Sequence, residues 1–223
     1  VFWRITGAGA SFQAGSSAVD SATIVAGLVN HLTGSVYAVG AASAVLRLGW
    51  LLPQLLVGFL AQRVERRMPF YVVGAFGRAS CLALIALLLA NVGEPQSGWI
   101  VGGFLALWTM YAFVSGIVAV PYNDIVGRSI PSGARSRMLA WRFFFGGMLA
   151  LGVAAVIDRL LATETLFTAY ALIFALASAL MFISSFSFVS AGEPPPPNQK
   201  HSMTPDFAQF LKGGMEVLRS DTR

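Results

Sequence analysis

Six long apolar runs dominate this sequence and restrict what the chain can fold into. They cover residues 5–28, 37–60, 70–90, 99–121, 138–158 and 165–189. Each run is about 20 residues long, which is the length that an α-helix needs to cross the hydrocarbon core of a bilayer. Backbone groups in lipid must be paired within the protein, and a membrane barrel would show shorter, alternating runs. We therefore expect an all-α membrane protein with six transmembrane helices.

The composition agrees with a lipid environment. Charged residues make up 11% of the chain and hydrophobic residues 56%, whereas an ordinary soluble domain carries about 25% charged residues. A soluble fold of this size could not cover its surface with so few charges, so the lipid bilayer is the expected partner. The formal net charge is +5, but the basic residues lie at the ends of the apolar runs rather than in a separate basic domain. We expect no nucleic-acid partner.

Lysine and arginine are distributed unequally between the two sides of the expected bundle. Of the 15 basic residues, eleven fall on the side that holds the turn between the second and third runs, one falls on the opposite side, and three lie within runs. The eleven are Arg4, Arg63, Arg66, Arg67, Arg128, Arg135, Arg137, Lys200, Lys212, Arg219 and Arg223. Because loops rich in basic residues stay in the cytoplasm, this predicts a multi-pass protein of the cell inner membrane with both ends cytoplasmic.

Two regions are expected along the chain. Residues 1–190 would form the transmembrane bundle, and residues 191–223 would form a cytoplasmic linker. The linker contains a stiff proline run at 194–197, and Thr204-Pro205 is typical of a helix start. Apolar residues at helical spacing follow, which predicts an amphipathic helix on the membrane surface. Since the sequence begins without methionine and stops inside this helix, we expect a fragment of a longer protein.

The turn between the second and third runs, GFLAQRVERRMPF at residues 58–70, concentrates three arginines. It resembles the signature G-x-L-a-D-r-x-G-r-r of the major facilitator superfamily. The matching positions are Gly58, Leu60, Ala61, Arg63, Arg66 and Arg67. Gln62 stands where the family has aspartate, and Glu65 stands where it has glycine. A second basic turn at residues 131–137 is similar to the family's turn before span five, so the resemblance covers the whole chain as a pattern of spans.

The resemblance implies a function. The chain would be the amino-terminal six-helix half of a secondary transporter, which moves a small solute by alternating access together with a C-terminal six-helix half, and a proton is a candidate coupling ion. The turn would act as a conformational switch, carried by Gly58, Gln62, Arg63, Glu65, Arg66 and Arg67. Because Gln62 has no charge, Glu65 is the candidate that replaces the family's aspartate. On the alternative interpretation, the arginines only anchor the turn at the cytoplasmic side.

Polar residues inside the runs mark a candidate cavity, because a charge at the bilayer centre costs at least about 2.5–3.5 kcal/mol. Asp20 and Arg47 would lie ~12 and ~15 Å from the outer ends of their helices, at similar depth. We expect them to form an ion pair that binds the substrate or a proton; alternatively, the pair only fixes helix packing. The other candidates for the cavity wall are Gln13, Ser17, Gln54, Tyr111 and Ser115. Arg78 is expected to reach the cytoplasmic side or to pair with Glu65.

An enzyme is the main alternative from another class of protein, and the sequence does not favour it. The chain has two histidines and one cysteine, and it contains none of the spacings typical of zinc sites, nucleophile elbows or phosphate-binding loops. We therefore expect no enzyme activity, no metal and no cofactor. The remaining alternative to the transporter is a self-contained six-span channel or small carrier that assembles as an oligomer.

Overall fold

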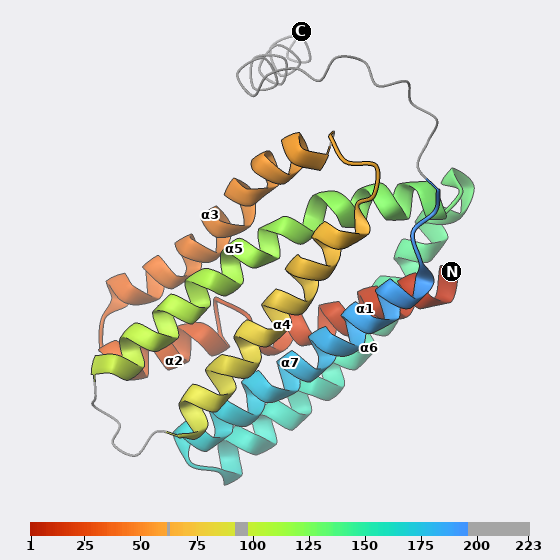
Figure 1. The fold of residues 1–223 in the computed structure, drawn as a ribbon. Helices are drawn as coiled ribbons and strands as arrows, with labels where there is room; N and C mark the ends of the chain where they lie inside the picture. The colour runs from red at the N-terminus through yellow and green to blue at the C-terminus, as the bar shows by residue number, and fades with distance from the viewer. Residues whose placement is uncertain (62, 92–97, 196–223) are drawn as a thin grey trace, which may run out of the picture.

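Seven α-helices make up the part of the protein that the computed structural model describes, which is residues 1–61, 63–91 and 98–195 (Figure 1). They are α1 (Phe2–Ala18), α2 (Ile24–Thr33), α3 (Val36–Ala61), α4 (Met68–Ala90), α5 (Gly98–Ser129), α6 (Ser132–Thr163) and α7 (Leu166–Ala191). Five of them, α3 to α7, are long and apolar enough to cross a membrane. The all-α class is confirmed, and these helices indicate a multi-pass membrane protein.

The helices α3 to α7 correspond to the last five predicted spans. The boundaries of α3, α4 and α7 agree closely with the prediction, but α5 and α6 are longer, with 32 residues each. Both extend beyond their apolar runs towards Pro131, which lies between them. Polar residues can continue a helix outside the hydrocarbon core. A proline disfavours helical geometry at the residue that precedes it, so α5 ends shortly before Pro131. The predicted amphipathic helix after Thr204 lies outside the described residues.

The predicted first span, residues 5–28, is not a single helix. α1 ends at Ala18 and α2 begins at Ile24, with an irregular segment between them. In that segment the Asp20 carboxylate accepts hydrogen bonds from the backbone N–H groups of Ala22 (3.0 Å) and Thr23 (3.1 Å). Such a side chain competes with helical backbone bonding and favours a turn. Because α1 has only 17 residues and α2 has 10, six membrane-spanning helices are not confirmed.

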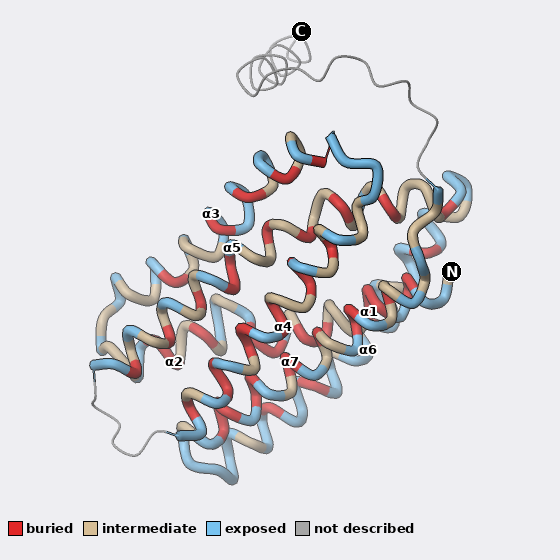
Figure 2. Tube along the Cα trace, viewed as in Figure 1, coloured by how far each residue is buried: buried red, intermediate tan, exposed pale blue. Residues whose placement is uncertain are grey.

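The long helices form one continuous succession of contacts. α3 packs against α5, α5 against α4, α4 against α7, α7 against α1, and α1 against α6, while α2 packs on α3. Buried residues line the contacting faces and exposed residues the outer ones (Figure 2). The outer face of α3 carries large apolar side chains such as Leu51 and Leu55. These faces suit lipid, whose tails are as apolar as leucine.

One end of the bundle, which we call the basic end, comprises residues 1–4, 63–68, 128–137 and 192–195. There α1, α4 and α6 begin and α3, α5 and α7 end (Figure 1). A guanidinium nitrogen of Arg4 donates to the carbonyl oxygen of Ser190, which joins the start of α1 to the end of α7. The basic end therefore contains seven of the arginines that the sequence predicts on one side of the membrane, which are Arg4, Arg63, Arg66, Arg67, Arg128, Arg135 and Arg137.

The helices α3 and α5 approach closely at Gly49 of α3, which lies against Ala112, and at Gly116 of α5. A Cβ atom at Gly116 would lie 2.6 Å from the carbonyl oxygen of Trp50 and 2.8 Å from that of Gly49. Both neighbours are backbone atoms of α3, so a side chain at Gly116 would force the two helices apart. Small residues allow this kind of backbone contact between membrane helices.

We expect Gly116→Ala to lower the thermal unfolding temperature of the purified protein in detergent, because overpacking of this kind costs about 1–3 kcal/mol. Gly102→Ala on the same helix is the matched control, since a Cβ atom there meets nothing within 4 Å. Equal unfolding temperatures for the two variants would contradict the close approach of α3 and α5.

Candidate functional site

A cavity of about 210 Å³ lies within the bundle, in the half nearer the basic end. Its lining comes from α1 and from each of α3 to α7. The lining includes the aromatic rings of Phe12 and Trp50 and a set of polar side chains, which are Tyr71, Arg78, Ser115, Tyr122, Asn123, Arg142 and Ser184. The two arginines distinguish this cavity from an ordinary packing defect, because a charge is rarely kept inside a membrane bundle without a function.

Arg142 enters the cavity from α6. One of its terminal nitrogens donates to the hydroxyl of Tyr122, with 2.9 Å between the two atoms, while its Nε atom is buried without a hydrogen-bond partner. The side chain crosses α1 at Gly9, where a Cβ atom would lie 2.5 Å from its Cδ atom. The absence of a side chain at Gly9 therefore creates the space that Arg142 occupies.

Arg78 enters the same cavity from α4. The residue is 5% exposed, and its guanidinium carbon lies 4.3 Å from the centroid of the Phe12 ring, a distance typical of a cation–π contact. Its Nε atom is also buried without a partner. The expectation that Arg78 reaches the cytoplasmic side or pairs with Glu65 is wrong, because Arg78 is enclosed by the bundle and takes part in no ion pair among the described residues.

The structure places the seven predicted cavity residues at different positions, and only Ser115 lines the cavity. Gln13 faces Gly146 on α6, and Ser17 donates to the backbone oxygen of Ala14. Gln54 donates to the backbone oxygen of Trp50, and Tyr111 is buried and stacks on Trp108. Ser17, Gln54 and Tyr111 thus make local contacts in the described part of the chain, whereas the Oε1 atom of Gln13 is buried without a hydrogen-bond partner.

Asp20 and Arg47 do not form the predicted ion pair. Asp20 is exposed in the segment between α1 and α2, where its carboxylate also accepts from the hydroxyl of Thr23 (3.1 Å). Arg47 is exposed on α3, and the ion pairs of the described residues involve neither side chain. Their similar depth along two helices did not bring them together, because depth does not fix the direction in which a side chain points.

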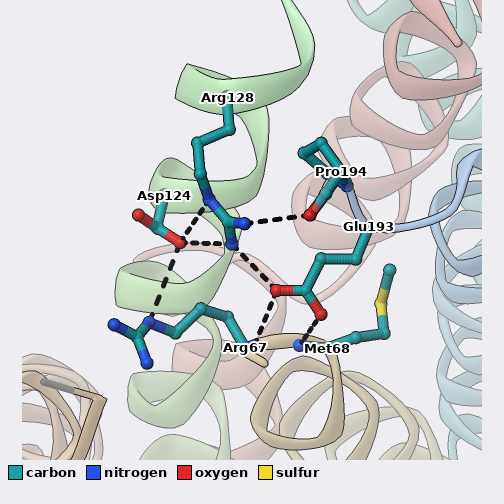
Figure 3. A network of polar contacts seen from close by, with 6 residues as sticks. All are labelled: Arg67, Met68, Asp124, Arg128, Glu193 and Pro194. Atoms are coloured by element: carbon teal, nitrogen blue, oxygen red, sulfur yellow. Dashed lines mark hydrogen bonds and ion pairs between the residues drawn. The ribbon is translucent and has the colours of Figure 1, made fainter. Parts of the chain in front are cut away.

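A second group of charged residues lies at the basic end (Figure 3). Arg128 on α5 forms ion pairs with Asp124 (2.6 Å) and Glu193 (2.8 Å), and it donates to the backbone oxygen of Pro194. Arg67 lies 3.8 Å from the same Asp124 carboxylate. This cluster joins the end of α5, the turn before α4 and the segment that follows α7.

Glu193 also caps α4. Its carboxylate accepts from the backbone N–H groups of Arg67 (2.7 Å) and Met68 (3.0 Å), and the residue at the N-cap position of α4 makes no side-chain cap of its own. Burial of the carboxyl raises the pKa of Glu193, but the hydrogen bonds from Arg67, Arg128 and Met68 outweigh this effect. The pKa of Glu193 therefore lies below its ordinary value.

The predicted switch turn is only partly described. Gly58 lies near the end of α3, and Arg63, Glu65 and Arg66 are exposed in the turn, where the Arg63 guanidinium lies over the ring of Phe59. Gln62 lies outside the described residues. The acids that face Arg67 are Asp124 and Glu193, which the sequence reasoning missed. The spacing of Asp124 and Arg128, four residues apart on one helix, was the available signal.

The fold and the cavity define a class, which is a helical membrane protein with a polar cavity inside an apolar bundle. In sequence the chain is similar to the MFS transporter fmqE of Aspergillus fumigatus, with 28% identity over 68% of this chain and 32% of that protein. It is also similar to the uncharacterized protein Rv2209 of Mycobacterium tuberculosis, with 25% identity over 73% of this chain and 31% of that protein.

The chain thus spans about a third of the length of these relatives. No protein-family model and no solved structure matches it. The resemblance to the major facilitator superfamily, drawn from the basic turn and the pattern of spans, is confirmed as a distant similarity in sequence.

Replacement of Asp20 separates a structural role from a functional one. We expect Asp20→Ala to destabilise the purified protein by about 0.5–2 kcal/mol, because two backbone N–H groups lose their acceptor. Asp20→Asn keeps an acceptor oxygen and should unfold near the wild-type temperature. A transport defect in well-folded Asp20→Asn would instead favour the predicted role in substrate or proton binding.

Replacement of Glu193 tests the cluster at the basic end. We expect Glu193→Gln to lower the unfolding temperature at pH 7, because the neutral amide loses the ion pair and the charge-assisted hydrogen bonds. A hydrogen bond to a charged group contributes about 1.5–3 kcal/mol. Because the folded pKa lies below the ordinary value of 4.5, the stability from the carboxylate is fully present above that pH and is lost as the pH falls through the folded pKa. The difference between variant and wild type should therefore shrink below about pH 4.5. A difference that stayed constant from pH 7 to pH 3 would contradict this assignment.

Proposed function

We propose that this chain is the amino-terminal half of a secondary transporter that moves a small solute across a cell membrane by alternating access, with the cavity as the solute site. The observation that carries the proposal is the polar cavity with two arginines, enclosed by helices whose outer faces are apolar. Ionisable groups inside a membrane bundle generally mark a solute or ion pathway. The similarity to an MFS transporter supports a transporter over an enzyme.

The basic end is proposed to face the cytoplasm, in accordance with its arginines. There the ion pairs of Arg128 with Asp124 and Glu193 connect α5 to the segment after α7, while Glu193 caps α4. Separation of these elements would break the charged contacts, so the cluster would hold them together in one state of the proposed cycle and release them in the other. This supports a switching role for the neighbouring turn, with Asp124 and Glu193 as its acids.

A second six-helix half is part of the proposal. The relatives are about three times as long as the part that this chain matches, which leaves room for one. In transporters built from two such halves, the solute site lies between them near the bilayer midplane, and rocking of the halves exposes it to each side in turn. A proton is a candidate coupling ion, and a self-contained six-span channel or small carrier that acts as an oligomer is the alternative function.

A single cysteine at Ser115 tests alternating access in the intact protein, in a Cys81→Ala background and in membrane vesicles of each orientation. We expect a membrane-impermeant maleimide to label this position from both sides, because the cavity opens to each side in turn. Ser80→Cys is the control, since Ser80 is exposed on α4 and does not line the cavity.

Labelling of the Ser115 cysteine from one side only would overturn alternating access. Unitary currents through the purified protein in a planar bilayer would favour the oligomeric channel instead.

A further inference from the structure

We propose that the cavity binds an anionic group of its solute, a carboxylate or a phosphate, through Arg78 and Arg142. This inference rests on the proposed function, because it takes the cavity as the solute site, and it adds the charge class of the solute.

The first argument is the absence of a counter-ion in the described part of the cavity. The ion pairs of the described residues all lie at the basic end and involve Arg67 and Arg128, so no described carboxylate lies within 4.0 Å of Arg78 or Arg142. Arg78 is buried and Arg142 is half-buried, and a buried charge without a partner carries a desolvation cost of several kcal/mol. A bound anion would supply the missing partner for both guanidinium groups.

The second argument is the set of hydrogen-bond donors. The Nε atoms of both arginines are buried without partners, and Arg142 uses one terminal nitrogen for Tyr122. A guanidinium group is a planar fork of five donors that matches a carboxylate or phosphate in a bidentate way. An anion between the two arginines would satisfy donors that no described residue satisfies, whereas a cation would be repelled.

The third argument is the size and shape of the cavity. Its volume of about 210 Å³ is below the range of about 300–1,000 Å³ that is common for drug-sized ligands. The rings of Phe12 and Trp50 line the cavity beside the charges, and they suit a short apolar body. A small organic acid or phosphate ester fits these features better than a large lipophilic drug.

The contact of Arg142 with Gly9 allows a substitution at Gly9 to displace the Arg142 guanidinium group while the charge itself is kept. A Cβ atom at Gly9 would clash with Arg142 along its side chain, at 2.5 Å from Cδ and 2.8 Å from Cγ. Gly7 lies on the same helix, and a Cβ atom there would meet only the Ser187 hydroxyl at 4.0 Å. Gly9→Ala and Gly7→Ala are therefore a matched pair.

The experiment measures thermal stabilisation of the intact protein in detergent at constant ionic strength, with four anions as probes: acetate, succinate, inorganic phosphate and glycerol 3-phosphate. Acetamide, succinamide, glycerol and choline are the uncharged and cationic controls. We expect at least one anion to raise the unfolding temperature in a saturable way while its uncharged counterpart does not. The apparent Kd should rise at least about tenfold in Arg142→Gln and in Gly9→Ala, the loss expected for one charge-assisted hydrogen bond.

Arg47→Gln and Gly7→Ala should keep the wild-type affinity, since Arg47 is exposed on α3 away from the cavity lining. Arg78→Gln should resemble Arg142→Gln, and Gly9→Ala keeps the test valid if Arg78→Gln does not fold. Stabilisation by none of the anions, equal stabilisation by the controls, or unchanged affinity in Arg142→Gln would overturn the proposal. Thermal stabilisation by an anion does not depend on transport. Cysteine labelling from one side only would therefore contradict alternating access without contradicting the anion site.

Discussion

Lipid is the constraint on which the rest of the structure depends, because every charge and backbone group inside a bilayer needs its partner within the protein. Two groups of described charges show how the protein meets this constraint. At the basic end, Arg67 and Arg128 are paired with Asp124 and Glu193. Inside the bundle, the arginines of the cavity lie among aromatic rings and hydroxyl groups, with no described acid beside them. The first group needs no ligand, whereas the second has a place for one, and this difference makes the cavity the candidate solute site.

Glycine contributes to the bundle in two physically different ways. Gly49 and Gly116 bring the backbones of α3 and α5 together, so they act on the distance between helices. Gly9 on α1 instead gives room to the side chain of Arg142 from α6. The position of that charge therefore depends on how α1 and α6 lie against each other. A small displacement of one helix along the other would move the guanidinium group relative to the cavity, which is a means of linking helix motion to anion affinity in the proposed transport cycle.

Hydrophobicity predicted α3 to α7 because a continuous apolar run of this length is stable in lipid as a transmembrane helix, whose backbone groups are all paired within the helix. It failed at the first span, where the carboxylate of Asp20 binds backbone N–H groups and interrupts the helix. For the site, the sequence reasoning identified Ser115, but the other candidates point elsewhere because depth along a helix does not define its rotation. Arg142 was visible as an arginine within an apolar run, yet only the packing of α1, α4 and α6 shows that it shares a cavity with Arg78.

The departure of the basic turn from the family signature has a physical counterpart at the end of α7. The signature places an acid within the turn, where this chain has Gln62, and here the acid that binds the start of α4 is Glu193. A carboxylate at a helix N-terminus is favoured both by hydrogen bonding and by the helix dipole. Because Glu193 lies after the last described helix, the turn is held by the segment that leads out of the bundle. In the proposed transporter of two halves, that segment would be the connection to the second half, and a displacement of the connection would act directly on the turn and on α4.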